Sequence, residues 1–245
     1  MNFSFCLPTL GNEGLVLTFL ESLERTTKFK NKIEVLFAID EGKTDIVDFV
    51  RKREYSFDIQ FFERPRTRDF TNDYYNFLAS RSKGDNVIAF NDDAWMRTQN
   101  WDEKILRTIK EYGWSIYMLD LPDTARIKYQ HQFPCFPCVS RRGMNTLGFL
   151  LNKDVPMYPA DKATHAIYYH AKRVIPIRDV MIEHDHVIES DPSKSRMMEI
   201  FKESGGTNRP LIIGDYVLKL GVAAGTEAGR KPSKFKRIIN ILKEA

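Results

Sequence analysis

The chain has 245 residues, 42% of them hydrophobic, which is enough to bury one α/β core and excludes an intrinsically disordered protein. Its 37 basic and 33 acidic residues leave a net charge of only +4, so the overall charge does not by itself indicate a nucleic-acid-binding protein. No apolar run approaches the ~18 residues of a membrane span, no cleavable apolar leader is visible, and the cysteines are too few for a disulfide framework, so we expect a cytoplasmic protein.

The first half of the chain alternates apolar runs with segments of helical spacing. Runs such as FSFCLP and IEVLFAID predict short buried strands, and the apolar residues after them recur at helical spacing. In chain order we expect strand 3–8, helix 12–28, strand 33–40, helix 45–53, strand 57–63, helix 73–84 and strand 86–91. This alternation predicts an α/β fold with a mostly parallel, Rossmann-like central sheet and helices on both faces.

The second half of the chain is less regular. A helix over 102–113 and a strand over 114–121 are expected first. A segment rich in Pro, Arg and aromatic residues, 126–143, then passes over the carboxyl ends of the strands, where ligands bind in such sheets. A helix over 160–173 and a late strand over 180–190 follow. The segment contains Cys135 and Cys138 in the sequence CFPC, for which ordinary packing is a better explanation than a zinc or redox role because no second cysteine pair exists.

The last segment, 229–245, holds six basic residues against one acid and predicts an amphipathic helix. Such a helix either packs its apolar face on the domain or makes a peripheral contact with an anionic membrane or a nucleic acid. We therefore expect one domain over 1–228 followed by this basic tail.

Carboxylates collect where the predicted strands end. Asp40 ends one strand, and Asp92 and Asp93 follow the apolar run VIAF, so all three would lie near one crevice at the carboxyl edge of the sheet. Mg²⁺ and Mn²⁺ prefer oxygen ligands, and adjacent carboxylates could hold either ion against a diphosphate. The alternative is a simple turn, because Asn-Asp-Asp is common in turns.

Four motifs in this order resemble the GT-A glycosyltransferases, in particular the large inverting family 2-type group. LPTLGNEGLVLTFLESL resembles the opening of that group, and AIDEGKTD resembles its acidic turn after the second strand. NDYYNFLASRSKGDNVIAFNDDAWM is similar to its helix, strand and acidic motif, and LGFLLNKDVPMYPADKATH to its segment around the general base. The resemblance covers roughly residues 3–190. It implies that the domain 1–228 is catalytic, with 1–120 as its nucleotide-binding half and 121–228 as its acceptor-side half.

The resemblance implies donor-binding roles near the start of the chain. Asp40 would contact the nucleotide base, Asp92 would lie beside the ribose and the metal, and Asp93 would ligate the divalent cation, Mn²⁺ or Mg²⁺. Thr9 and Glu13 would line the nucleotide pocket. The family often has an Asp at the position of Asn91, immediately before these two carboxylates.

The resemblance also implies the remaining site residues. Asp161, just before a helix, would be the general base, although a helix N-cap explains an Asp there equally well, and Asp154 is the second candidate for the base. His184 and His186 lie two apart on a predicted strand and face the same way, so either could complete the metal site, and a structural pair is the alternative. Apart from the resemblance, Arg66 in the basic run ERPRTRD could face the donor diphosphate or an anionic acceptor, or it could belong to a solvated loop.

The resulting hypothesis is a metal-dependent, inverting, hexosyltransferase-type glycosyltransferase. It would move one sugar from a nucleotide-diphosphate sugar, with UDP-sugars as first candidates, to the hydroxyl of a glycan, a lipid-linked molecule, a protein or a modified nucleic acid. A DNA-directed glycosyltransferase is one version of this hypothesis. The alternatives are a nucleotidyltransferase on a related sheet and a non-catalytic module that binds a nucleotide sugar or a nucleic acid.

Overall fold

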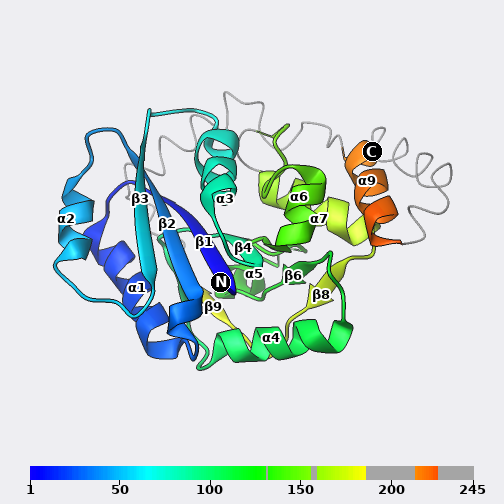
Figure 1. Ribbon diagram of the computed structural model, residues 1–245, viewed down its shortest axis with the longest axis horizontal. Coiled ribbons are helices and arrows are strands. Elements are labelled where there is room, and N and C mark those ends of the chain that lie inside the picture. The colour runs from blue at the N-terminus through cyan, green and yellow to red at the C-terminus, as the bar shows by residue number, and fades with distance from the viewer. Residues whose placement is uncertain (131, 156–158, 186–212, 226–245) are drawn as a thin grey trace.

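The computed structural model describes residues 1–130, 132–155, 159–185 and 213–225 (Figure 1). Seven strands form the central sheet in the order β3-β2-β1-β4-β7-β6-β8. Their bounds are β1 (Phe3–Thr9), β2 (Ile33–Asp40), β3 (Asp58–Arg64), β4 (Asn86–Ala89), β6 (Met118–Asp120), β7 (Cys138–Ser140) and β8 (Val174–Pro176). β1 to β4 are mutually parallel, β6 is parallel to β8, and β7 is antiparallel to both of its neighbours.

Helices cover both faces of this sheet, as predicted (Figure 1). They are α1 (Glu13–Thr26), α2 (Asp45–Arg51), η2 (Thr71–Asn76), α3 (Phe77–Arg81), α4 (Trp101–Tyr112), α5 (Thr124–Tyr129), α6 (Arg141–Leu147), α7 (Ala160–His170) and α9 (Gly214–Ala224), with the short turn η1 (Lys30–Lys32) before β2. α1, α2 and α4 contribute to one hydrophobic core, and α3, α6, α7 and α9 contribute to the other. The molecule therefore has three layers.

Strand β1 shows how the sequence separates the two cores. Phe3, Phe5 and Leu7 enter the core under α1 and α4, whereas Cys6 enters the opposite core. This alternation follows from the period of two residues along a strand. Trp101, at the start of α4, is fully buried and meets Phe3 edge-on at 4.9 Å between ring centroids. Each fully buried side chain of this size contributes about 1.5–3 kcal/mol of hydrophobic stabilisation.

The amino edge of the sheet contains a buried carboxylate. Glu34 of β2 is fully buried, and its Oε1 accepts hydrogen bonds from the Ser4 hydroxyl and from the backbone N–H groups of Lys83 and Gly84. The Gly84 carbonyl in turn accepts a 2.9 Å hydrogen bond from Nε of Arg141. These contacts join β1, β2 and the turn before β4.

Two further strands form a separate sheet beyond the end of β4. β5 (Ala94–Met96) pairs antiparallel with β9 (Ile182–His184), and Ala94 is the register partner of His184. This ladder continues into the loop, where the Asp185 N–H donates to the Asp93 carbonyl at 3.0 Å. Residues that are far apart in the sequence thus meet immediately after the acidic motif.

The second half of the chain differs from the sequence-based expectation. The segment 126–143 does not only pass over the sheet, because it contains β7, which lies between β4 and β6. Of the predicted strand 180–190, residues 182–184 form β9 of the small sheet, and residues 186–190 lie outside the described part of the chain. The predicted basic helix 229–245 lies outside the described residues.

Candidate functional site

Three neighbouring strands, β2, β1 and β4, end at the same edge of the sheet, and their ends carry the predicted polar residues. The Thr9 hydroxyl at the end of β1 donates a 2.6 Å hydrogen bond to Oδ2 of Asp92, which follows β4. The same hydroxyl accepts the N–H of Gly11 at 3.0 Å, and Gly11 has a φ of +87°, which a glycine adopts without strain. Thr9 and Asp92, both expected at the carboxyl ends of the strands, are thus in direct contact there.

Two consecutive tyrosines of η2 reach the same strand ends. The Tyr74 hydroxyl donates to Oδ1 of Asp40, at the end of β2, and the Tyr75 hydroxyl donates to Oδ1 of Asn91 at 2.5 Å. η2 is a π-helical turn, a rare geometry that often accompanies functional sites. Burial and the neighbouring carboxylates raise the pKa of both hydroxyls, so both remain protonated donors. The sequence indicated a helix here but not the roles of its tyrosines.

Asp40 is contacted by the predicted donor-binding arginine. Nε of Arg66 lies 3.6 Å from Oδ2 of Asp40, and the Arg66 side chain is 61% exposed. Arg64 is engaged elsewhere, because its Nε donates to the Asp73 carbonyl and its guanidinium stacks on Phe77. Arg66 is therefore well placed to meet a ligand in the crevice.

The remaining predicted pocket residue, Glu13, lies exposed in the first turn of α1. That helix begins at an Asn12 cap, whose side chain accepts the Leu15 N–H at 3.2 Å. Its N-terminus follows directly on the Thr9 loop. Glu13 is thus at the same edge of the sheet as Thr9, but it points into solvent.

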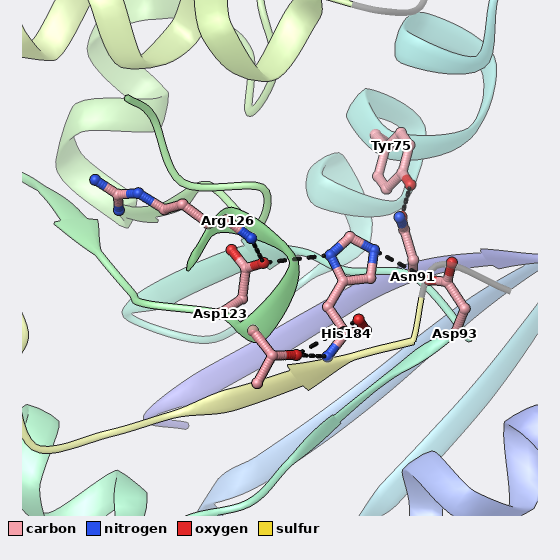
Figure 2. A network of polar contacts seen from close by, with 7 residues as sticks. Tyr75, Asn91, Asp93, Asp123, Arg126 and His184 are labelled. Atoms are coloured by element: carbon pink, nitrogen blue, oxygen red, sulfur yellow. Dashed lines mark hydrogen bonds and ion pairs between the residues drawn. The ribbon is translucent and has the colours of Figure 1, made fainter. Parts of the chain in front are cut away.

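Asp93 and His184 face each other across the small sheet (Figure 2). His184 Nε2 lies 3.6 Å from Asp93 Oδ1, and this buried oxygen has no hydrogen-bond donor among the described residues. Burial raises the pKa of Asp93, and the nearby His184 partly offsets this shift. A carboxylate oxygen and an imidazole nitrogen that face each other at this distance fit the ligand chemistry of a divalent metal ion. The predicted alternative, His186, lies outside the part of the chain that the structure describes.

Asp123 approaches the same imidazole from its other nitrogen, and the sequence analysis did not select it (Figure 2). Its Oδ1 lies 3.4 Å from His184 Nδ1 and also accepts the Arg126 N–H at 2.8 Å, which caps α5. Burial acts to raise the pKa of Asp123, but the hydrogen bonds from His184, from the Arg126 backbone and from Cys135 outweigh it and lower the pKa. In the sequence, DLPDTA reads as a turn, and only the fold places this carboxylate beside β9.

Asp123, Cys135 and His184 also form a group with metal-binding chemistry. Their potential ligand atoms all lie within 4.8 Å of one another. Cys138 is not part of this group, because it is buried in β7, and all three cysteines are free thiols. The CFPC motif therefore does not act as a pair, and Cys135 is the member near the site.

Asp161 lies in the first turn of α7, where Pro159 and not Asp161 is the N-cap residue. Its Oδ1 accepts the Lys162 N–H at 2.7 Å. Burial raises the pKa of Asp161 to about 6, although the Lys162 contacts oppose the shift. The charge of Asp161 contributes to the raised pKa of Tyr75. Because the Tyr75 hydroxyl donates to Asn91, Asp161 lies within electrostatic reach of the acidic motif. The cap explanation is therefore wrong, while the role of general base stays a prediction.

Asp154, the second candidate for the base, is engaged elsewhere. It is exposed, and its Oδ2 accepts a 2.8 Å hydrogen bond from the Tyr216 hydroxyl of α9.

Among the described helices, none is long and apolar enough to cross a bilayer.

The fold is similar to solved glycosyltransferase structures. Staphylococcus aureus TarS, residues 1–349, matches with a TM-score of 0.60 at 12% identity over 90% of this chain and 70% of that chain, and TarS has also been solved with UDP and with UDP-GlcNAc. The mannosyltransferase PcManGT from Pyrobaculum calidifontis, solved with GDP-Man and Mn²⁺, matches with a TM-score of 0.61 at 14% identity over 90% of this chain and 69% of that chain.

GalNAc-T7, solved with UDP, GalNAc and Mn²⁺, matches with a TM-score of 0.57 at 10% identity over 98% of this chain and 55% of that chain. Comparison with models of protein families and with curated proteins gives no match. The neighbours bind nucleotides or nucleotide sugars, and two of them were solved with Mn²⁺. The chain therefore has the GT-A fold, as its motifs indicated.

Proposed function

We propose that this GT-A chain is a metal-dependent, inverting, hexosyltransferase-type glycosyltransferase. It transfers one sugar from a nucleotide-diphosphate sugar, with UDP-sugars as first candidates, to an acceptor hydroxyl. The observation that carries the proposal is the Asp93–His184 pair, which faces inward beside the strand ends that hold Asp40 and Asp92. The fold neighbours with UDP-GlcNAc, GDP-Man and Mn²⁺ support the same chemistry.

In this proposal the first half of the domain, 1–120, binds the donor. Asp40, oriented by Tyr74, accepts a hydrogen bond from the base, and Arg66 beside it faces the diphosphate. Asp92, held by Thr9, lies at the ribose. Carboxylates that are fixed before the ligand arrives lose little conformational entropy on binding.

The cation would be held by Asp93 Oδ1 and His184 Nε2. Their 3.6 Å separation fits a Mn²⁺ or Mg²⁺ site, as does the buried Oδ1, which accepts no hydrogen bond from the described part of the chain. When bound, the cation neutralises the charge that develops on the leaving diphosphate. His184 contributes a nitrogen ligand, which Mn²⁺ accepts more readily than Mg²⁺ does.

Asp161, in the acceptor-side half 121–228, acts as the general base. It accepts the proton of the acceptor hydroxyl while the acceptor oxygen forms a bond to the anomeric carbon of the sugar. The bond between that carbon and the diphosphate oxygen breaks, and the nucleoside diphosphate leaves with the electron pair. A pKa of about 6 keeps Asp161 ionised at neutral pH and makes it more basic than an ordinary aspartate.

The test is release of nucleoside diphosphate from a panel of UDP-, GDP- and dTDP-sugars, with Mn²⁺, Mg²⁺ or EDTA and a mixture of acceptors. We expect metal-dependent release from one donor, lost in Asp93→Asn and retained in Asp58→Asn, which changes an exposed carboxylate at the opposite edge of the sheet. Pyrophosphate release from nucleoside triphosphates would instead support a nucleotidyltransferase. Donor binding without any turnover would support a binding module.

A further inference from the structure

His184 is held between two carboxylates, one at each ring nitrogen (Figure 2). Nε2 faces Asp93 at 3.6 Å and Nδ1 faces Asp123 at 3.4 Å. A neutral imidazole carries one proton, and the hydrogen bond at one nitrogen decides which nitrogen remains free as a ligand. The two carboxylates therefore compete to determine which face of the ring can hold a cation.

The surroundings of the two carboxylates are unequal. The Asp93 side chain is 23% exposed and directly follows Asp92 at the carboxyl edge of the sheet, whereas Asp123 is completely buried. A cation that bridges a diphosphate must lie where the diphosphate can reach it. Asp93 satisfies this requirement and Asp123 does not.

Asp123 is also fixed in position more firmly than a surface ligand would be. Its Oδ1 caps α5 through the Arg126 N–H at 2.8 Å. Its backbone pairs with Ile182 in an isolated parallel bridge, and the Ile182 N–H donates to the Pro122 carbonyl at 3.1 Å. The carboxylate is thus tied to the same strand, β9, that carries His184.

The imidazole is restrained from the remaining sides. The backbone N–H of His184 donates to the Thr124 hydroxyl at 2.9 Å and holds the strand in place, and the ring packs against Phe136 with 4.7 Å between centroids. The ring is 4% exposed, so rotation out of this position would require repacking of the core. With the ring held in this orientation, Nδ1 faces Asp123 and Nε2 faces Asp93, so the position of the single proton decides which nitrogen can hold a cation.

We propose that Asp123 is a positioning residue for the metal site: it accepts the Nδ1–H of His184 and so directs the unprotonated Nε2 toward Asp93. This inference rests on the proposed function. A carboxylate behind a metal-binding histidine fixes the tautomer and raises the basicity of the ligand, and loss of such a partner typically weakens metal affinity ~10- to 100-fold. Cys135, which contacts the same carboxylate, belongs in this arrangement to its surroundings and is not a ligand.

The first measurement is Mn²⁺ affinity of the full chain by electron paramagnetic resonance, without and with UDP. We expect Asp123→Ala to weaken binding roughly 10- to 100-fold and Asp93→Asn to weaken it at least as much. Asp123→Asn, which keeps an oxygen for the α5 cap, should fold like the wild type and lose less affinity than Asp123→Ala. Cys135→Ser should remain within about threefold of the wild type, as expected for a residue outside the ligand set.

The second measurement needs neither metal nor activity. Nitrogen chemical shifts of the His184 ring, recorded by NMR at alkaline pH in the absence of metal, should report a protonated Nδ1 in the wild type and a mixture of tautomers in Asp123→Ala. If that variant keeps the wild-type tautomer and Mn²⁺ affinity, Asp123 has no positioning role while the proposed function stands. Equal losses in Cys135→Ser and Asp123→Ala would also overturn the inference, because both would then be direct ligands of a thiolate-containing site.

A wild type that binds no Mn²⁺ under either condition would refute the metal dependence in the proposed function. The ring shifts would then still show whether Asp123 sets the tautomer. The two failures are therefore distinguishable in the same set of proteins.

Discussion

Replacement of Gly84 by alanine should destabilise the protein strongly, because the new methyl group would enter the backbone of β1. A Cβ at Gly84 would lie 2.4 Å from Oγ of Ser4, 2.7 Å from the Ser4 nitrogen and 2.8 Å from the carbonyl carbon of Phe3. The serine hydroxyl could rotate, but the two backbone atoms belong to a central strand paired on both sides. The turn before β4 must therefore move away from β1.

The cost follows from two contributions. Overpacking of a tight site typically costs about 1–3 kcal/mol. The displacement also weakens the hydrogen bonds from the Gly84 N–H to Ser4 Oγ at 2.7 Å and to the buried Glu34 carboxylate at 3.2 Å, and a hydrogen bond to a charged group contributes roughly 1.5–3 kcal/mol. We expect a loss of about 3–5 kcal/mol in the free energy of unfolding, which in a protein of this size lowers Tm by roughly 10–15 °C.

The assay is thermal and urea unfolding followed by far-UV circular dichroism. Gly14→Ala is the matched control, because Gly14 lies in the first turn of α1 and its Cβ would meet only the Asn12 side chain, at 3.5 Å. That substitution should be neutral or stabilise the protein by up to ~1 kcal/mol. If Gly84→Ala changes the unfolding free energy by less than about 1 kcal/mol, the close approach of this turn to β1 is wrong.

Two further predictions concern the proposed site. The turnover rate should fall about tenfold per pH unit below about pH 6, because the base acts as a carboxylate and protonation of Asp161 removes it. Asp161→Asn should lower the turnover rate ~10²- to 10⁴-fold and abolish this acid limb in the pH profile of nucleoside diphosphate release. A variant with unchanged acid limb would assign the titration to another group. Tyr74→Phe should weaken UDP binding about tenfold in calorimetry, since Asp40 loses its donor, whereas Tyr129→Phe at an exposed tyrosine should not; equal affinities in the two variants would remove Tyr74 from the donor site.

The sequence was most informative where elements are long and strongly periodic. The first three strands have seven or eight residues, and each ends within one residue of its predicted bound. β5, β7 and β8 have three residues each, which is too short for a hydrophobic period to be detected. β7 pairs with β4 and β6 through the backbone, and its position depends on tertiary contacts that no local pattern encodes.

In the candidate site, too, the sequence predicted the residues next to long strands and missed those whose role depends on tertiary contacts. Thr9, Asp40 and the acidic motif directly follow predicted strands, so the topology of a parallel sheet brought them together. Asp123 and Tyr74 did not stand out, because an aspartate after proline resembles a turn and a tyrosine in a helix resembles core packing. Their partners, His184 and Asp40, are distant in sequence, and only the folded chain reveals the contacts.

The small sheet of β5 and β9 has a consequence for the dynamics of the protein. Two three-residue strands form a weak ladder in isolation, so this region should open more easily than the central sheet. Opening would separate Asp93 from His184, because each lies at the same end of the ladder. A ligand held by both residues binds only the closed form and therefore stabilises the ladder by mass action. The order of this corner of the molecule should thus rise with cation concentration, and the free energy of global unfolding should rise with it, because the unfolded chain does not hold the ion between these two residues.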